Sequence, residues 1–209
     1  MIKKKELKLT QNWDKTFPKS DKVDHCKVTF VNRYGITLAA DMYYPKDTEG
    51  KLPAIAVCGP FGAVKEQCSG LYAQTMAERG FLTIAFDPSF TGESGGNVRY
   101  MASPDINTED FMAAVDFLSL CDKVDPQRIG IIGICGWGGM ALNTAALDTR
   151  IKATVASTMY DMTRVNAKGY FDGEDSEDAR YQKRAAMCCS SFFPPCIRPR
   201  NLRSPRRIS

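Results

Sequence analysis

The sequence predicts an α/β fold with a doubly wound, mostly parallel sheet that is preceded by an antiparallel hairpin. Three observations support this prediction. From residue 53 onwards, short apolar runs with β-branched residues alternate with stretches of helical periodicity. A segment with a period of two precedes them at 23–43, and a glycine cluster at 133–139 joins an apolar run directly to a helical stretch. Strands and helices that alternate in this way form parallel sheets covered by helices.

Composition indicates a single globular domain, because 209 residues suffice for a full core. The hydrophobic fraction of 44% and the charged fraction of 25% are ordinary for a globular chain. The sequence shows neither a signal-peptide core nor a run of membrane-spanning length, so we expect a cytoplasmic protein that binds neither membranes nor nucleic acid. Without any Cys-x-x-Cys pair, the eight cysteines are expected as reduced thiols, and we predict no metal and no cofactor. Composition does not indicate an oligomeric state.

The segment 23–43 has the pattern of a hairpin that is buried on one face. Val28 and Phe30 alternate with polar residues, and the same alternation resumes after a turn that contains Gly35. His25, the only histidine of the chain, falls in the first strand of this hairpin. We expect it to be a surface or edge residue without a catalytic role.

Two strands buried on both faces are predicted next, at 53–58 and 81–86, because each is a short continuous apolar run. The loop 59–67 follows the first of them. A helix that contains Leu71, Met76 and Ala77 leads to the second strand, and Gly80 is expected to end this helix as a C-cap.

After residue 86 the chain is predicted to form a long turn, a helix and, further on, another strand. Asp87 is expected to anchor the turn by hydrogen bonds, as Asx side chains commonly do. Thr108 is predicted to cap a helix whose first turn holds Glu109 and Asp110. After the helix at 140–147, the apolar segment 151–160 is predicted as a further strand.

The corner at residues 129–147 carries the strongest chemical signal. Small residues allow a sharp turn between strand and helix, and four are present: Gly133, Gly136, Gly138 and Gly139. Cys135 is the one side chain of the turn that can attack a carbonyl carbon. At the start of a helix its thiolate form is favoured, and the N–H of Gly136 is expected to face an oxyanion formed on a bound acyl group.

The corner resembles the nucleophile elbow of α/β-hydrolases, Gly-x-Ser-x-Gly, with Cys135 in the serine position. Trp137 stands where the last glycine is expected, and Gly138 follows one place later. The string Gly-Ile-Cys-Gly-Trp-Gly-Gly is similar to that of dienelactone-hydrolase-like and X-prolyl-peptidase-like hydrolases related to fungal polyketide transferases. The resemblance implies an α/β-hydrolase fold whose last strands are missing here. It also implies transfer of the acyl group of a small ester or lactone to water, with Cys135 as nucleophile.

The same resemblance implies further site residues in the loop 59–67. In these hydrolases the loop after this strand supplies a second oxyanion N–H, for which we propose the backbone of Phe61. A plain turn with no such role is the alternative. Gly62 and Trp137 are candidates for the substrate pocket, although a core position for Trp137 is equally compatible with its size.

In this fold the catalytic acid and the catalytic histidine follow the nucleophile along the chain. The resemblance to the family ends before the positions where these two residues are expected. Residues 169–186 have the composition of a charged helix, whereas 187–209 show no periodicity and hold five arginines without Asp, Glu or Lys. A basic tail for nucleic acid or acidic membranes, a flexible extension and an out-of-frame translation are three explanations, and we favour the last. The expected organisation is an N-terminal extension at 1–22, an incomplete hydrolase core at 23–186 and an irregular tail at 187–209.

Two other functions are compatible with these residues. Without a histidine after Cys135 the chain is expected to be an impaired hydrolase, or a binding or remnant protein without catalysis. Gly136-x-Gly138-x-x-Ala141 also satisfies the dinucleotide fingerprint, with Asp161 near the spacing of the ribose-binding acid. Strands and helices that precede the motif weigh against this NAD-binding alternative, which also leaves Cys135 without a task.

Overall fold

The computed structural model describes residues 6–10, 12–97 and 99–192. Contacts divide the chain into two compact units, one that ends at Tyr160 and one that begins at Asp161. No helix among the described residues is both long enough and apolar enough to cross a membrane.

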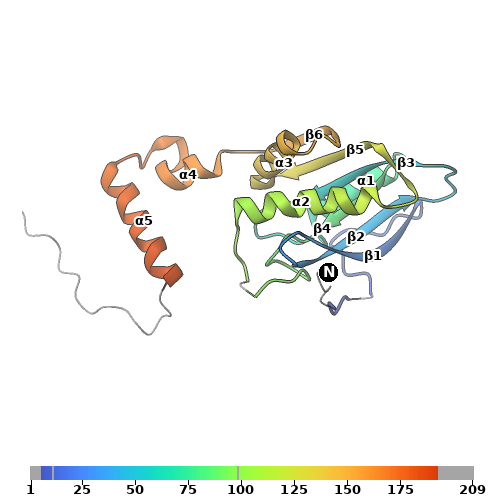
Figure 1. Ribbon diagram of the computed structural model, residues 1–209, viewed down its shortest axis with the longest axis horizontal. Helices are drawn as coiled ribbons and strands as arrows, with labels where there is room; N and C mark the ends of the chain where they lie inside the picture. Colours follow the sequence, from blue (N-terminus) through green and yellow to red (C-terminus); the bar gives the residue numbers. More distant parts are fainter. Residues whose placement is uncertain (1–5, 11, 98, 193–209) are drawn as a thin grey trace, which may run out of the picture. The chain divides into compact units, whose positions relative to one another are not determined.

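The first unit is built on a six-stranded sheet with the strand order β1-β2-β4-β3-β5-β6 (Figure 1). β2 pairs antiparallel with both β1 and β4, and the remaining neighbours are parallel. The predicted mixed sheet, with antiparallel strands at its N-terminal end, is therefore confirmed. The strands are β1 (Val23–Val31), β2 (Thr37–Pro45), β3 (Leu52–Cys58), β4 (Leu82–Phe86), β5 (Val124–Ile134) and β6 (Ile151–Ser157).

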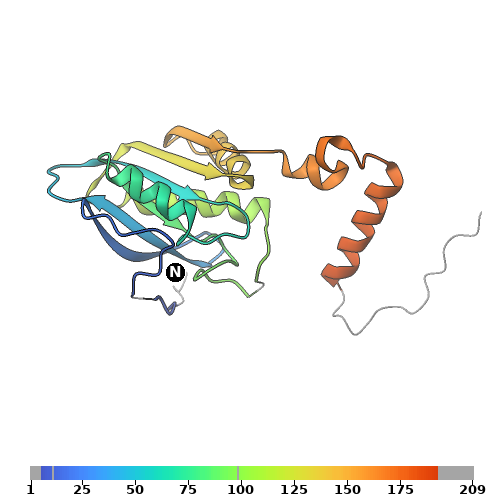
Figure 2. The same cartoon turned by 180° about the vertical axis from the view of Figure 1, so that it is seen from behind.

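Helices cover both faces of the sheet. α2 (Pro104–Ser119) and α3 (Gly136–Leu147) lie on the face seen in Figure 1, and α1 (Cys68–Ala77) lies on the face seen in Figure 2. β3 shows why both faces are apolar. Ala54 and Ala56 belong to the core cluster beneath α2, while Ile55 and Val57 belong to the cluster beneath α1. Because successive side chains of a strand point to opposite faces, a strand between two helical layers has to be apolar throughout.

The hairpin and the end of α1 agree with the predicted pattern. β1 and β2 pair in register, with Val28 opposite Ala40. Gly80 follows α1 with a φ of +96°, and its N–H donates to the carbonyl oxygen of Ala77 at 3.0 Å. A left-handed glycine in this place ends a helix because it lacks a Cβ.

The predicted start of α2 is wrong. The helix begins at Pro104, and the side chain of Ser103 caps it by accepting the N–H of Ile106. Proline at the first helical position is preorganised for the turn and has no N–H to satisfy. Glu109 and Asp110 are therefore inside the helix and buried, where they bind polar groups of other segments.

The N-terminal segment packs on the first unit. The ring of Phe17 is buried in the core cluster beneath α1. The N–H of Thr16 donates to the carbonyl oxygen of Glu66 at 3.0 Å, and the side-chain amide of Gln74 donates to the carbonyl of Pro18 at 3.0 Å. The described residues of this segment are thus fastened to the loop before α1 and to α1 itself.

The second unit contains α4 (Met162–Lys168), the short helix η1 (Tyr170–Asp172) and α5 (Glu177–Phe192). Ion pairs between neighbouring segments connect these helices, for example Lys183 with Glu174 at 2.6 Å. The prediction that regular structure stops at residue 187 is wrong, because α5 continues to Phe192. The rest of the predicted tail, 193–209, lies outside the described residues.

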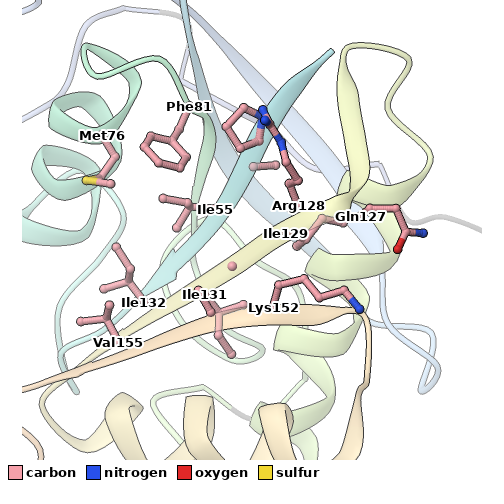
Figure 3. A pocket seen from close by; sticks show the side chains of 14 residues that line it. Ile55, Met76, Phe81, Gln127, Arg128, Ile129, Ile131, Ile132, Lys152 and Val155 are labelled. Carbon is pink, nitrogen blue, oxygen red and sulfur yellow. The ribbon is translucent and has the colours of Figure 1, made fainter.

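One part of the sheet is open on the α1 face. An apolar groove of about 380 Å³ runs between α1 and the strands β5 and β6 (Figure 3). Met76 and Phe81 line it on the α1 side, and Ile132 and Val155 line it on the strand side. Val155 is 51% exposed, because no helix of the first unit lies over β6 on this face.

Candidate active site at the corner between β5 and α3

Cys135 forms the corner between β5 and α3 in a backbone conformation that side chains rarely adopt. It is the N-cap residue of α3, with φ +60° and ψ −130°. Its N–H donates to the carbonyl oxygen of Ser157 at 2.8 Å, and its own carbonyl accepts the N–H of Gly138 at 2.9 Å. Strained residues of this kind persist only where the surrounding structure holds them, and they cluster at active sites.

Two glycines allow the corner to pack this tightly. A Cβ at Gly133 would overlap the carbonyl oxygen of Trp137, and a Cβ at Gly138 would lie 2.8 Å from the Cβ of Met159. Gly139 differs, because a Cβ there meets no atom within 4 Å. Of these three glycines, the first two are required by close contacts and the third is not.

The Cys135 side chain is partly exposed at the N-terminal end of α3. The N–H groups of the first helical turn have no acceptor within the helix, and they carry the positive end of its dipole. Gly136 is the first residue of α3, so its N–H is one of these groups. An anion that forms on an acyl group bound to Cys135 would meet a hydrogen-bond donor there.

The loop after β3 packs directly against this corner. A Cβ at Gly59 would overlap the carbonyl oxygen of Ile134 and lie 2.8 Å from the Cβ of Trp137. The rings of Phe61 and Trp137 lie 5.6 Å apart between centroids. The structure therefore brings Phe61, the predicted source of the second oxyanion N–H, next to the corner that carries Cys135.

A cavity of about 380 Å³ opens beside the corner, and we call it the corner cavity. Trp137 and Gly62, the two predicted pocket residues, both line it, as does Phe61. Trp137 is also a core residue, since it is only 2% exposed and packs against Phe111. Cys135 itself does not line the cavity. The full lining is Pro60, Phe61, Gly62, Ala63, Val64, Pro88, Thr91, Gly92, Tyr100, Met101, Ala102 and Trp137.

A buried group of charges lies behind the loop after β3. The ammonium of Lys65, which is 1% exposed, binds Asp87 at 2.9 Å, Glu93 at 2.8 Å and also Glu66. Lys27 on β1 binds the same Glu93 at 2.8 Å. The members of this group come from three segments, and we call it the Lys65 cluster; it consists of Lys27, Lys65, Glu66, Asp87 and Glu93.

Electrostatic interactions favour the charged forms of Lys65 and Glu93 within this cluster. Burial tends to lower the pKa of Lys65, but the carboxylate of Asp87 and the two glutamates raise it above its ordinary value. Burial likewise opposes ionisation of Glu93, yet hydrogen bonds from Lys27 and Lys65 lower its pKa to about 2. A buried lysine is satisfied here because each of its charged contacts is a carboxylate.

The predicted role of Asp87 as a loop anchor is confirmed. One carboxylate oxygen accepts the backbone N–H of Lys65 at 2.8 Å, and the other accepts the backbone N–H of Glu93 at 2.9 Å. Asp87 thereby joins the loop after β3 to the loop after β4. Both loops contribute residues to the corner cavity, so this carboxylate holds its two walls together.

His25 lies on β1, the edge strand of the sheet, as predicted, but its ring is not on the surface. Its side chain is largely buried on β1, with Nε2 2.8 Å from an oxygen of Asp41, and its ring lies 5.2 Å from that of Trp13. Asp41 also binds Lys15 at 2.9 Å. The contacts of the His25 side chain lead to Asp41, Trp13 and Tyr43, so the described residues do not bring the histidine and the thiol together.

Sequence reasoning missed the Lys65 cluster. A lysine in a loop carries no pattern that separates a buried from an exposed position, and its partners are distant in the sequence. The only available signal was Asp87, an acid placed directly after a buried strand. Its partner could have been sought among the charged residues of the neighbouring loop.

The fold and the corner together define the class of protein. A mixed sheet with helices on both faces, and a strained residue between a central strand and a helix, are the features of an α/β-hydrolase. Residues 34–184 match the family of X-Pro dipeptidyl-peptidases (S15 family), and the chain belongs to this family.

Relatives of this chain come from bacteria and fungi. Protein PA2218 of Pseudomonas aeruginosa is 73% identical over 168 residues, which are 80% of this chain and 45% of that protein. YcjY of Escherichia coli is 41% identical over 73% of this chain and 51% of its own length. Thiohydrolase aneE of Aspergillus aculeatus is 30% identical over 63% of this chain and 41% of its own.

A solved structure supports the fold. The crystal structure of PA2218 superimposes with a TM-score of 0.87 at 66% identity, and the match covers 90% of this chain and 59% of that one. The chain thus spans about half the length of the curated relatives it matches. Membership of a hydrolase family favours acyl chemistry over the NAD-binding alternative. Asp161, the proposed ribose-binding acid, caps α4 in the second unit.

Proposed function

We propose that the chain attacks the carbonyl carbon of an ester, a lactone or a related acyl compound through Cys135. The observation that carries this proposal is the backbone of Cys135, which is held at φ +60° between a central strand and a helix N-terminus. Such a conformation would turn the side chain of Cys135 out of the strand and towards the N–H groups at the start of α3, which supports the proposal. The membership of a hydrolase family and the name thiohydrolase of the fungal relative support the same chemistry.

The first half of the reaction forms a thioester. The sulfur of Cys135, as thiolate, bonds to the carbonyl carbon, whose π electrons move to its oxygen. The N–H of Gly136 and the backbone N–H of Phe61 stabilise this oxyanion. When the carbonyl re-forms, the bond to the leaving oxygen breaks, and the alcohol departs after taking up the proton that the thiol lost.

The second half of the reaction transfers the acyl group to water and needs a base. His25 is the only histidine in the sequence, and its ring is engaged with Asp41. We therefore propose that this chain by itself forms the thioester and hydrolyses it slowly. A nucleophile without its base keeps only the help of the oxyanion donors and of substrate binding.

A stoichiometric labelling experiment tests the proposal. The pure protein is mixed with p-nitrophenyl acetate, whose leaving group needs no general acid, and the release of p-nitrophenol is followed. We expect a burst of about one equivalent and then slow turnover, with an acetyl group on Cys135 by peptide mass spectrometry. Cys135→Ala should abolish the burst, and Cys68→Ala is the matched control. A burst that survives Cys135→Ala would show that another residue reacts.

The same experiment separates the hydrolase from a remnant protein that only binds ligands. The described contacts of the His25 side chain lead to Asp41 and not to Cys135, and the lack of a base beside the thiol favours the remnant. If Cys135 is neither acetylated nor alkylated faster by iodoacetamide than Cys68, the corner has the form of a nucleophile elbow without its reactivity. Rapid and selective acetylation contradicts the remnant.

A further inference from the structure

We infer that the corner cavity binds an uncharged aromatic acyl group, of about the size of phenylacetyl. The inference rests on the proposed function for the bond that is broken, but binding of the aromatic group does not depend on that reaction. Four observations support this inference. They are the size of the cavity, its lining, the contacts of the neighbouring cations and the hydrogen bonds that hold its walls.

Size and shape limit the group that enters. The volume of about 380 Å³ is near the lower end of the range of roughly 300–1,000 Å³ that is usual for ligand pockets. The rings of Phe61 and Trp137 are tilted by 46° to each other on one side, and Phe111 supports Trp137 from behind at 6.0 Å. A single flat ring can pack against such rings in an offset or edge-on geometry, which stabilises it beyond the burial of its area.

The lining disfavours a charged group. None of the described residues that line the corner cavity is charged, and the polar groups of its side chains are the hydroxyls of Thr91 and Tyr100 and the indole N–H of Trp137. A carboxylate that enters would lose its hydration without gaining a cationic partner, which is unfavourable.

Two cations belong to the loops that form the walls, and neither lines the cavity. Lys65 follows the lining residue Val64, but its ammonium is shared among three carboxylates. The guanidinium of Arg99 donates to the carbonyl oxygens of Ser94 at 2.5 Å and Gly92 at 2.6 Å. Lys65 cannot bind an anionic substrate without breaking these contacts, and Arg99 is exposed and is not among the residues that line the cavity.

The walls are preformed, which distinguishes the corner cavity from a chance gap between loops. The N–H of Tyr100 donates to the carbonyl of Phe90 at 2.9 Å, and the N–H of Phe90 donates to the carbonyl of Gly95 at 2.9 Å. The backbone N–H and the hydroxyl of Ser89 bind the buried carboxylate of Asp110 at 2.8 and 2.7 Å. The loop after β4 is thus folded on itself and tied to α2, so a ligand would not have to order it.

Binding can be measured without any reaction. In the variant Cys135→Ala with Trp13→Phe, Trp137 is the remaining tryptophan, because the chain has two. Its fluorescence is titrated with phenylacetamide, acetamide and 4-carboxyphenylacetamide. We expect phenylacetamide to change the emission and to bind at least about tenfold more tightly than either of the others, as for a group that fills an apolar pocket.

Three further variants place the ligand in the cavity. Ala102→Phe fills the cavity mouth and should abolish binding of phenylacetamide, whereas Ala146→Phe, at an exposed position of α3, should leave it unchanged. Ala102→Arg supplies a free cation and should shift the preference towards 4-carboxyphenylacetamide. Equal affinities for the three amides, or phenylacetamide binding that Ala102→Phe does not affect, would overturn the inference.

Acylation kinetics separate this inference from the proposed function. The wild-type chain is treated with the p-nitrophenyl esters of phenylacetic, acetic and 4-carboxyphenylacetic acid. Selective binding of phenylacetamide with no ester label on Cys135 supports the cavity and refutes the proposed function. Label on Cys135 at equal rates for the three acyl groups supports the function and refutes the inference.

Discussion

The first unit has two hollows of similar volume, and they differ in what surrounds them. The groove on the α1 face is bounded by regular elements, and its walls are side chains of β5, β6 and α1. The corner cavity is bounded by loops that a buried lysine, three carboxylates and several N–H groups hold in place. Beside it stand a strained thiol residue and the N-terminus of α3. Polar groups that converge beside an apolar space distinguish a binding site from an uncovered part of the core.

The largest difference in stability between the two hollows is expected when a lysine beside each of them is replaced. Lys65→Met leaves the carboxylate of Asp87 without its buried cation, and losing one partner of a buried ion pair costs about 3–5 kcal/mol in unfolding free energy. Lys152→Met at the rim of the groove is the matched control, with an expected change within about 0.5 kcal/mol. Urea unfolding measures both. Equal stabilities for the two variants would show that the Lys65 cluster does not support the cavity.

A smaller difference in stability is expected when one methyl group is added on β5, once at the corner and once at the groove. Gly133→Ala forces a Cβ onto the carbonyl of Trp137, and such overpacking costs about 1–3 kcal/mol. Gly130 lines the groove. In Gly130→Ala the new Cβ would lie 3.1 Å from the carbonyl oxygen of Ala153, so the neighbouring backbone has to move only slightly. Thermal unfolding should therefore show the larger loss for Gly133→Ala. The reverse order would contradict the packing described at the corner.

The dependence of stability on pH tests the Lys65 cluster in a graded way. The pKa of Glu93 is about 2 in the folded protein against 4.5 for the ordinary side chain, so between these values the unfolded chain binds more protons. The contribution of Glu93 is thus fully present above pH 4.5 and is lost as the pH falls towards 2. In urea unfolding across this range, Glu93→Gln should flatten the decline. Glu49→Gln, in an exposed loop, should decline as steeply as the wild type.

The smallest effect on stability is expected at the groove itself. Val155 is 51% exposed there, so Val155→Lys should change the unfolding free energy by less than about 0.5 kcal/mol. The same substitution places a charge in the exposed apolar surface of the edge strand β6. It should therefore lower the concentration-dependent association of the protein, which light scattering measures. Thr149→Lys, at an exposed loop position, is the control. Loss of binding to phenylacetamide in Val155→Lys would mean that the two hollows are not independent.

The mixed sheet and the corner were predictable because each rests on local patterns. Continuous apolar runs marked β3 and β4, and glycines around Cys135 marked a sharp turn between strand and helix. The start of α2 was not predicted because Thr108, with acidic residues directly after it, has the pattern of a cap, whereas Ser103 caps the helix five residues earlier. The helical residues 187–192 were missed because a cysteine- and serine-rich segment has no periodicity that indicates a helix.

The sequence by itself determined the order of strands and helices, the family, and the thiol that stands at the corner. These depend on neighbours in the chain, whose periodicity and backbone preferences act over a few residues. Only the tertiary structure decided that Lys65 is buried among carboxylates, that His25 binds Asp41, and that Trp137 belongs both to the core and to the cavity wall. Such facts depend on which distant segments meet, because a charge can be buried only where another segment brings its counter-charge.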